Sequence, residues 1–202
     1  QDVEALNPEL KKSRVPPDML PYPVRIPQGR RSSFEKSWPQ VAKNLKPLST
    51  YEVKFGDTLT RIAKVHGTTV KELASINDIP KKDVLIAGET LLVPQGPPPV
   101  LEQEDPPAVG VPAVQFVYPD HRRVFYEIIS GDTLSAIGAF FEVTVSDLCT
   151  WNDLDPDAHI HSGMWLQVFV PQDRDLSSAV ILEEDQVLVL QVNSLEFLDW
   201  QA

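Results

Sequence analysis

The sequence has a single cysteine, Cys149, and no apolar run of 18 residues, the length that a helix crossing a membrane requires. One cysteine excludes an intramolecular disulfide framework. A lone thiol among apolar residues usually packs as a small hydrophobic side chain, so we expect Cys149 to lie in a core. The sequence predicts no direct membrane span.

Basic residues are also few. The 18 Lys and Arg are outnumbered by 29 Asp and Glu, which gives a net charge of −11. Nucleic-acid binding depends on clustered basic side chains, and so does binding to an anionic membrane surface. The charge therefore predicts no nucleic-acid partner, and any polymer that the chain binds must be held mainly by uncharged contacts.

What the chain does have is a repeat. YEVKFGDTL at 51–59 returns as YEIISGDTL at 126–134, and the 75-residue offset holds without a gap through the pairs Asn77 and Asn152, and Val93 and Val168. A repeat this regular indicates a duplicated small domain. We call the two copies module 1 and module 2.

Local signals give each module the order β-α-α-β. In module 1 a short strand over 51–54 runs into a turn at Gly56, and either Asp57 or Thr58 caps the first helix. Gly67 ends that helix, Asn77 ends the second helix, and a strand closes the unit at 89–93. Module 2 has Glu142 where module 1 has Gly67, and its closing strand is longer by two residues.

The predicted fold class is α+β: tandem small βααβ modules joined by a Pro-rich linker. DVEALNP and YPVRIPQG, near the start, resemble the second half of a module, with Asn7 in the place of Asn77, so we expect a preceding half to lie before residue 1. The expected divisions are a truncated, divergent half-module (1–29), a connector with a short helix (30–50), module 1 (51–94), the linker (95–122), module 2 (123–171) and a tail with β-rich runs and a short helix (172–202).

Both modules resemble LysM domains, the small βααβ units that bind glycans containing N-acetylglucosamine. The residues that carry the resemblance are the opening tyrosine, the Gly-Asp-Thr-Leu turn, the asparagine after the second helix and the closing apolar strand that ends at Pro94 or Pro171. The resemblance implies non-catalytic binding of peptidoglycan strands of GlcNAc and MurNAc. It places the ligand between the turn and the loop after the second helix.

The resemblance therefore assigns the glycan-binding residues. They are Gly56, Asp57, Thr58, Leu59, Asn77, Asp78, Ile79, Pro80, Leu85 and Ile86 in module 1, and Gly131, Asp132, Thr133, Leu134, Asn152, Asp153, Leu154, Asp155, Pro156 and Ile160 in module 2.

Structural roles compete for several of these residues. The aspartates of the turns are at least as well suited to cap helices, and the asparagines to tie loops to backbone. Trp151 and Trp165 could stack on sugar, although a buried packing role is commoner. Module 1 has the cleaner pattern and is the better candidate for sugar.

No catalytic residues and no cofactor are predicted, because no nucleophile and base can be paired and no phosphate-binding glycine loop follows a strand. The alternating run of Asp155, Asp157, His159 and His161 could turn four ligands to one side, but a solvated loop is the commoner outcome, so no metal is expected.

The segment LNPELKKSRVPPDMLPYPVRIPQG resembles the stretch that follows the catalytic domain in membrane-bound lytic murein transglycosylases of type D. This resemblance implies that the chain targets such an enzyme to the cell wall in the bacterial envelope, in the periplasm. The alternative is an envelope scaffold that no longer binds glycan and instead binds a protein partner through module 2 and the tail.

Overall fold

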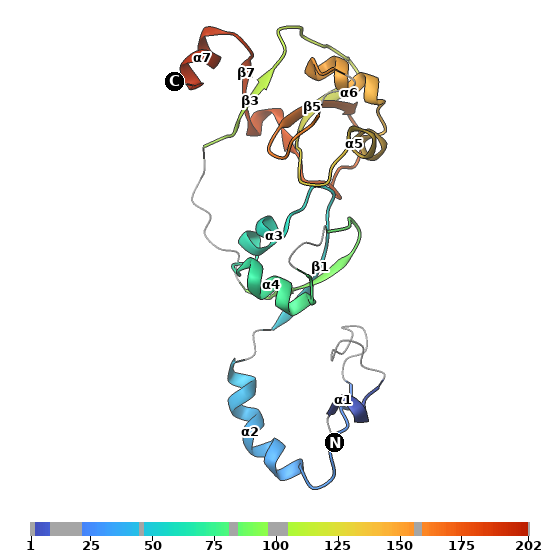
Figure 1. Cartoon of the computed structure of the whole chain (residues 1–202), viewed down its shortest axis with the longest axis vertical. Coiled ribbons are helices and arrows are strands. Elements are labelled where there is room, and N and C mark those ends of the chain that lie inside the picture. Colours follow the sequence, from blue (N-terminus) through green and yellow to red (C-terminus); the bar gives the residue numbers. More distant parts are fainter. Residues whose placement is uncertain are drawn as a thin grey trace.

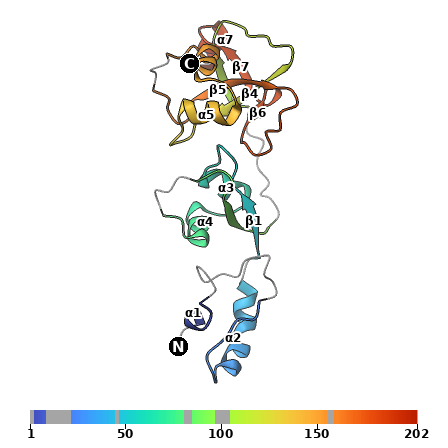
Figure 2. The ribbon, with the colours of Figure 1, turned by 90° about the vertical axis from the view of Figure 1, so that its right-hand side faces the viewer.

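The computed structural model of the chain describes residues 3–8, 22–44, 47–80, 85–96, 105–155 and 159–201. Three sections follow one another along the long axis of the molecule (Figures 1 and 2). Helices α1 (Val3–Leu6) and α2 (Arg31–Asn44) lie at one end, module 1 lies in the middle, and module 2 with the tail lies at the other end. No helix in the described ranges is long and apolar enough to cross a membrane.

Module 1 has the predicted order of elements. Strand β1 (Leu48–Glu52) is followed by helices α3 (Leu59–Val65) and α4 (Val70–Asn77) and by strand β2 (Thr90–Pro94). The two strands are antiparallel, with Tyr51 opposite Leu91. A small core holds the module together, and its buried members are Val53, Ile62, Ala63, Leu73, Leu91 and Val93.

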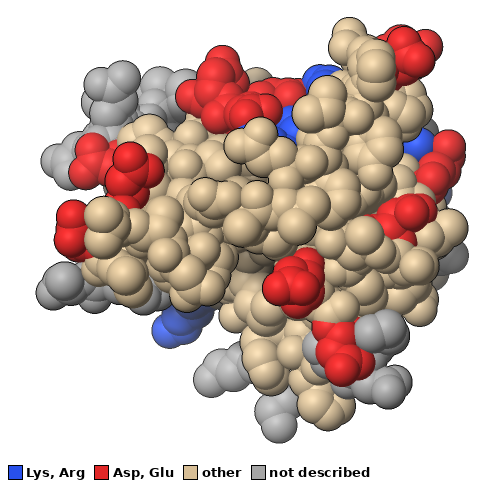
Figure 3. Space-filling model, turned by 90° about the horizontal axis from the view of Figure 1, so that it is seen from above, with Lys and Arg blue, Asp and Glu red and all other residues tan. Residues whose placement is uncertain are grey.

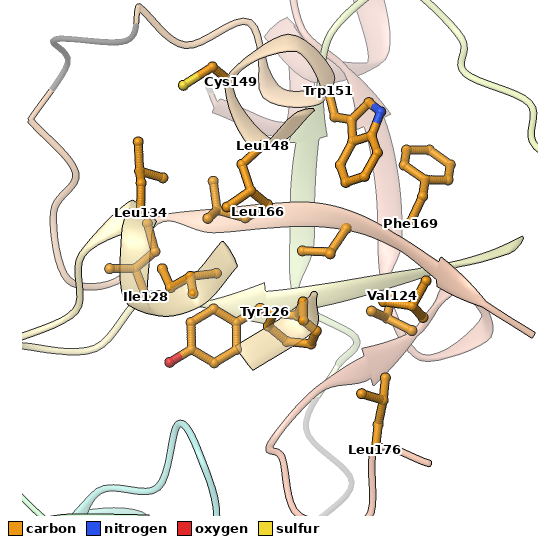
Figure 4. Close-up of a cluster of buried hydrophobic side chains, with 14 residues drawn as sticks. Val124, Tyr126, Ile128, Leu134, Leu148, Cys149, Trp151, Leu166, Phe169 and Leu176 are labelled. Atoms are coloured by element: carbon orange, nitrogen blue, oxygen red, sulfur yellow. The ribbon is translucent and has the colours of Figure 1, made fainter. Parts of the chain in front are cut away.

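Module 2 repeats this order with β4 (His121–Glu127), α5 (Leu134–Phe141), α6 (Val145–Asn152) and β5 (Trp165–Pro171). Strand β5 has seven residues and β2 has five, so the predicted difference of two is confirmed. The core is larger than that of module 1 and includes the aromatic residues Tyr126, Phe141, Trp151 and Phe169 (Figure 4). Cys149 is buried in it as a free thiol, as its surroundings predict.

Threonines begin all four helices of the modules. The hydroxyls of Thr58, Thr69, Thr133 and Thr144 each accept a hydrogen bond from the backbone N–H three residues later. Gly67 has a φ of 59°, as predicted for a left-handed residue after a helix. Glu142 takes the same conformation at the matching position, with a φ of 55°, so the turn persists without glycine.

The linker and the tail are more ordered than the sequence suggested. Strand β3 (Ala108–Val111) lies inside the linker and pairs in parallel with β7 (Leu188–Gln191) of the tail. The two β-rich runs of the tail do not pair as a hairpin, because β6 (Leu182–Glu183) joins β4 instead. A second small core explains this arrangement, since Val109, Val111 and Val187 cover the outward face of Phe125.

The connector and the end of the tail are helical. Helix α2 runs for 14 residues, so Pro39 does not interrupt it and Ser32 and Ser33 lie inside it rather than before it. Every residue of 31–40 is exposed, so water can satisfy the carbonyl that Pro39 leaves without a donor. Helix α7 (Leu195–Gln201) starts after Ser194, whose hydroxyl accepts from Phe197 N–H.

Candidate glycan-binding surfaces

The aspartate of each repeated turn faces inward. One carboxylate oxygen of Asp57 accepts hydrogen bonds from the Tyr51 hydroxyl at 2.7 Å and from Lys54 N–H at 2.8 Å. Asp132 repeats both contacts with Tyr126 and Ile129, at 2.7 and 2.9 Å. Thr58 and Thr133 cap the helices, so capping by Asp57 and Asp132 is wrong. These carboxylates brace the turn against the opening strand.

The two tyrosines are held in the protonated form. Burial, reinforced by the hydrogen bond to Asp57, raises the pKa of the Tyr51 hydroxyl well above its ordinary value. The same two causes, with Asp132 as the acceptor, also raise the pKa of the Tyr126 hydroxyl. Each tyrosine therefore remains a donor, and the turn keeps its shape, across the neutral pH range.

Asn77 and Asn152 close the modules. The Asn77 amide donates to Leu73 C=O at 2.9 Å and to Leu92 C=O at 2.8 Å, and its oxygen accepts from Leu92 N–H at 2.7 Å. Asn152 makes the same three contacts with Leu148 and Gln167. Each side chain therefore ties the end of the second helix to the closing strand.

Asn7 makes the same set of contacts near the start of the chain. Its amide donates to Val3 C=O at 2.6 Å and to Arg25 C=O at 2.8 Å, and its oxygen accepts from Arg25 N–H at 2.8 Å. Asn7 is buried. A helix end and a downstream extended segment are thus joined here as they are in the two modules.

The turn and the loop after the second helix meet at one end of each module. In module 1, Leu59 of the turn and Ile79 and Leu85 of the loop pack against the same core. Backbone hydrogen bonds reinforce the meeting, since Gly88 N–H donates to Val53 C=O and Val53 N–H donates to Glu89 C=O. Module 2 joins Ile128 to Gly163 and Met164 in the same way.

The predicted site residues divide into those that build this end of the module and those that stay open to solvent. Asp57, Asn77, Leu134 and Asn152 point into the structure, and Ile79, Leu85, Leu154 and Ile160 lie half-buried on the cores. Exposed members are Asp78, Pro80 and Ile86 in module 1, and Gly131, Thr133, Asp153 and Asp155 in module 2. Gly56, Thr58, Leu59 and Asp132 are half-buried, and Pro156 lies outside the described residues.

The turn of module 2 is the more accessible of the two. Gly131 and Thr133 are exposed, whereas their counterparts Gly56 and Thr58 are half-buried. Both glycines have positive φ, 98° and 86°, which a residue with a side chain rarely adopts. Because Gly131 is exposed and has no side chain of its own, the turn of module 2 presents backbone to solvent.

Basic side chains are few on the end of the molecule that carries module 2. Figure 3 views the molecule from the end that carries module 2 and the tail, and shows acidic side chains spread among uncharged ones, with few Lys or Arg. Such a face suits a neutral ligand better than a polyanion.

Both tryptophans considered for sugar contact serve packing. Trp151 is buried and donates its indole N–H to the Tyr118 hydroxyl at 3.1 Å, and Trp165 packs on the core around Phe125. Among the residues that the structure describes, no three His, Cys, Asp or Glu side chains gather as a metal site. Asp157, one of the four considered, lies outside them.

Sequence reasoning missed two features. A cavity of about 800 Å³ lies between the linker, the start of β4 and the tail, and none of the predicted glycan residues lines it. Phe55, beside the turn of module 1, packs on module 2. Its only sequence signal is that module 2 has Ser130 at the matching position.

The comparison with protein families agrees with the fold and the repeat. The LysM domain family matches residues 51–94 and 126–169. The chain therefore contains two LysM domains, which correspond to module 1 and module 2.

Curated proteins with similar sequences match over the same region. The chain is 34% identical over 107 residues to "Autolysin" of Enterococcus faecalis, which covers 53% of this chain and 14% of the relative. It is 33% identical over 116 residues to "Cell wall-binding protein YocH" of Bacillus subtilis, covering 57% of this chain and 32% of the relative. A 31% identical match over 115 residues to "Secreted LysM effector ECP6" of Passalora fulva covers 54% and 47%.

The chain thus spans less than half the length of each of these relatives. Among solved structures, the spore cortex-lytic enzyme SleL of Bacillus cereus matches with 20% identity and a TM-score of 0.23, over 63% of this chain and 23% of that one. A score this low supports no argument about the arrangement of the modules.

Proposed function

We propose that this chain binds glycans containing N-acetylglucosamine, without catalysing a reaction on them, at the end of each LysM domain where the turn meets the loop. The observation that carries the proposal is that, in both modules, some of the predicted site residues face inward while their neighbours stay exposed. The inward residues Asp57 and Asn77, and their counterparts, build the site. Exposed backbone and the exposed side chains of the turn and loop, among them Pro80, Ile86 and Asp155, stay open for a ligand.

The chemistry of such a ligand fits these surfaces. An acetamido group needs one hydrogen-bond donor and one acceptor, which exposed backbone at Gly131 supplies, and its methyl group needs apolar cover. Ile86 is 63% exposed and Pro80 is exposed, and neither residue belongs to the core of module 1. Neutral contacts of this kind also agree with the net charge of −11.

Peptidoglycan is the glycan that we propose, and the outer side of a bacterial cell membrane, in the periplasm, is the proposed location. Support comes from the names of two relatives, an autolysin and a cell wall-binding protein, and from the resemblance of the first 29 residues to type D lytic murein transglycosylases. The chain would then hold a transglycosylase on its substrate. The hydrogen bonds of Asn7 support a third, half-length module in that segment.

The direct test is a pull-down of the full chain on purified peptidoglycan sacculi. Ile86→Asp places a charge on the open surface of module 1, and Asp155→Ala removes an exposed acceptor in module 2. Val117→Asp is the control, because Val117 is 82% exposed and belongs to neither surface. We expect the first two variants to bind less than the control. Equal recovery of all three variants and the wild type contradicts the proposed sites, and no recovery of the wild type contradicts the proposed function.

The cavity favours a second candidate function, a protein-binding scaffold in the envelope. Its wall includes Phe116 and Tyr118 from the linker and the ion pair of Arg123 with Glu184, so it offers aromatic groups and charges of both signs to a partner. Tyr118→Ala separates the two functions. If the chain is a scaffold, Tyr118→Ala should lose a bound envelope protein and keep its binding to sacculi. If the chain binds glycan alone, the variant should bind sacculi as the wild type does, and no envelope protein should depend on Tyr118.

A further inference from the structure

Phe55 of module 1 is seated on module 2. Its ring stacks on Phe140 with centroids 4.1 Å apart and planes 5° apart, and it also contacts Tyr126 at 5.3 Å and Phe141 at 6.2 Å. The ring therefore belongs to the aromatic cluster of the neighbouring module. It packs there with the core of module 2 and takes no part in the core of its own module.

The backbone around Phe55 is fixed as well. Phe55 N–H donates to Ser178 C=O at 2.8 Å, and Val180 N–H donates to Phe55 C=O at 2.8 Å. The contact forms a short parallel bridge between Phe55 and Ala179. Two backbone hydrogen bonds and an aromatic ring packed on the neighbouring module indicate a specific, oriented interface between the two modules.

The first part of the tail forms one side of the surface that Phe55 contacts. Arg174 donates to Phe140 C=O at 2.6 Å and pairs with Glu142 at 2.8 Å, which fixes the tail to the end of α5. Leu176 then enters the core of module 2. The contacts of Arg174 and Leu176 hold Ser178 and Val180 in the position from which they bond to Phe55. The first part of the tail therefore supports the contact between the modules.

Gly56 shows how closely the modules fit. A β-carbon at this position would lie 2.8 Å from Cε2 of Tyr126 and 3.4 Å from Cβ of Val180. Figure 4 shows Tyr126 at the edge of its cluster, above the cyan loop of module 1. The glycine required by the turn is therefore also required by the contact between modules.

We propose that Phe55 is an anchor that holds the two LysM domains in one fixed orientation, so that both surfaces bind the same glycan polymer together. This rests on the proposed function and deepens it. Two weak sites gain from linkage only as far as their geometry lets both bind at once. A fixed orientation removes the entropy that a flexible linker would lose on the second binding event. Phe55 is in this sense a positioning residue, since it touches the other module and lies outside the proposed glycan contacts.

Phe55→Ser tests the proposal while leaving the core of module 1 intact. Serine occupies the matching position of module 2, Ser130, and Phe55 is not part of the core of module 1. Phe34→Ser is the matched control, because Phe34 lies exposed on α2. Phe140→Ala removes the facing ring from the other module and should reproduce the effect of Phe55→Ser.

Three measurements on the full chain decide the matter. Backbone ¹⁵N relaxation should show the modules tumbling as one body in the wild type and separately in Phe55→Ser. Affinity for a short GlcNAc oligomer, which occupies one module, should change by less than about twofold, and affinity for intact sacculi should fall by about tenfold. Phe34→Ser should match the wild type in all three.

Independent tumbling of the wild-type modules contradicts the anchor. Unchanged binding of Phe55→Ser to sacculi contradicts its role in binding, and so does tighter binding of the oligomer, which would mean that the contact covers the surface of module 1. A wild type that binds neither the oligomer nor sacculi contradicts the proposed function instead. The relaxation measurement then still tests the anchor itself.

Discussion

Asn77 holds Leu92 by both backbone groups of that residue, accepting from its N–H at 2.7 Å and donating to its C=O at 2.8 Å. Helix α4 and strand β2 are therefore joined by a side chain that mimics a neighbouring strand. The same relationship joins Asn152 to Gln167 and Asn7 to Arg25. Among the residues that the structure describes, this contact occurs three times with the same donors and acceptors.

Replacing Asn77 or Asn152 with alanine should strongly destabilise the module concerned. The change leaves one backbone N–H and one C=O group of the closing strand without their partner, at a cost of about 2–4 kcal/mol in the free energy of unfolding. Native-state hydrogen exchange at the Val93 and Val168 amides measures the loss in each module separately. Lys71→Ala, on the exposed side of α4, is the control. A loss below that of the control contradicts the structural role of the asparagine.

Asp132→Ala should destabilise module 2 more than Thr133→Ala does. Removing the Thr133 cap costs about 1 kcal/mol. Removing Asp132 leaves the Tyr126 hydroxyl and Ile129 N–H without an acceptor, and we expect about 2–3 kcal/mol. Hydrogen exchange at the core amides of module 2 ranks the two. The reverse order would make Asp132 the helix cap and Thr133 the lesser group.

Module 2 should lose stability at alkaline pH because of Tyr126. Burial and the bond to Asp132 raise the pKa of its hydroxyl in the folded state, so the unfolded chain releases this proton first as pH rises. The stabilisation is complete below about pH 10, the ordinary pKa of tyrosine, and is lost as pH rises toward the folded value.

Urea unfolding of the full chain at about pH 8 and about pH 11, on either side of the ordinary tyrosine pKa, measures this loss. Tyr126→Phe removes the titrating hydroxyl and should flatten the alkaline decline. Tyr118→Phe is the matched control, because the Tyr118 hydroxyl accepts from Trp151 and has no carboxylate partner among the contacts described. Equal declines in the wild type and in Tyr126→Phe would contradict the assignment.

Glycan binding should depend little on salt. The ligand is neutral, and the proposed contacts are mainly backbone and uncharged groups beside the exposed carboxylates of Asp78, Asp153 and Asp155. Affinity for GlcNAc oligomers should therefore change by less than about twofold between low and high ionic strength, where charge-driven binding would weaken strongly. Removing the acetyl groups of the ligand should weaken binding, because the acetamido group is lost and a positive charge appears. Strong salt dependence with the acetylated ligand would show that charged groups carry the affinity.

The repeat explains why much of the fold could be predicted. Helices α3 to α6 follow from local signals, since each has a threonine before it and an apolar face within its own eight or fewer residues. The role of Asn77 was considered because a side chain amide after a helix has backbone within reach. Thr58 and Asp57 could not be told apart, because both can accept at the start of a helix.

The remaining features depend on residues far apart in the chain. Strand β3 looked like linker because its partner β7 lies about 80 residues later, and the pairing is decided by the core around Phe125. Phe55 has no local signal of its role, because only the folded tail supplies Ser178 and Val180 to bond to it. The exposure of the module 2 turn follows from the same contact, which covers Gly56 and leaves Gly131 free.

The most direct test of the account is an NMR titration of the ¹⁵N-labelled full chain with GlcNAc oligomers of increasing length. We predict that amide shifts change at the turns 56–59 and 131–134 and in the loops 78–86 and 153–160, with the largest changes in the more exposed turn of module 2. Changes confined to the cavity around Tyr118, or no changes at any oligomer length, would contradict glycan binding by these surfaces.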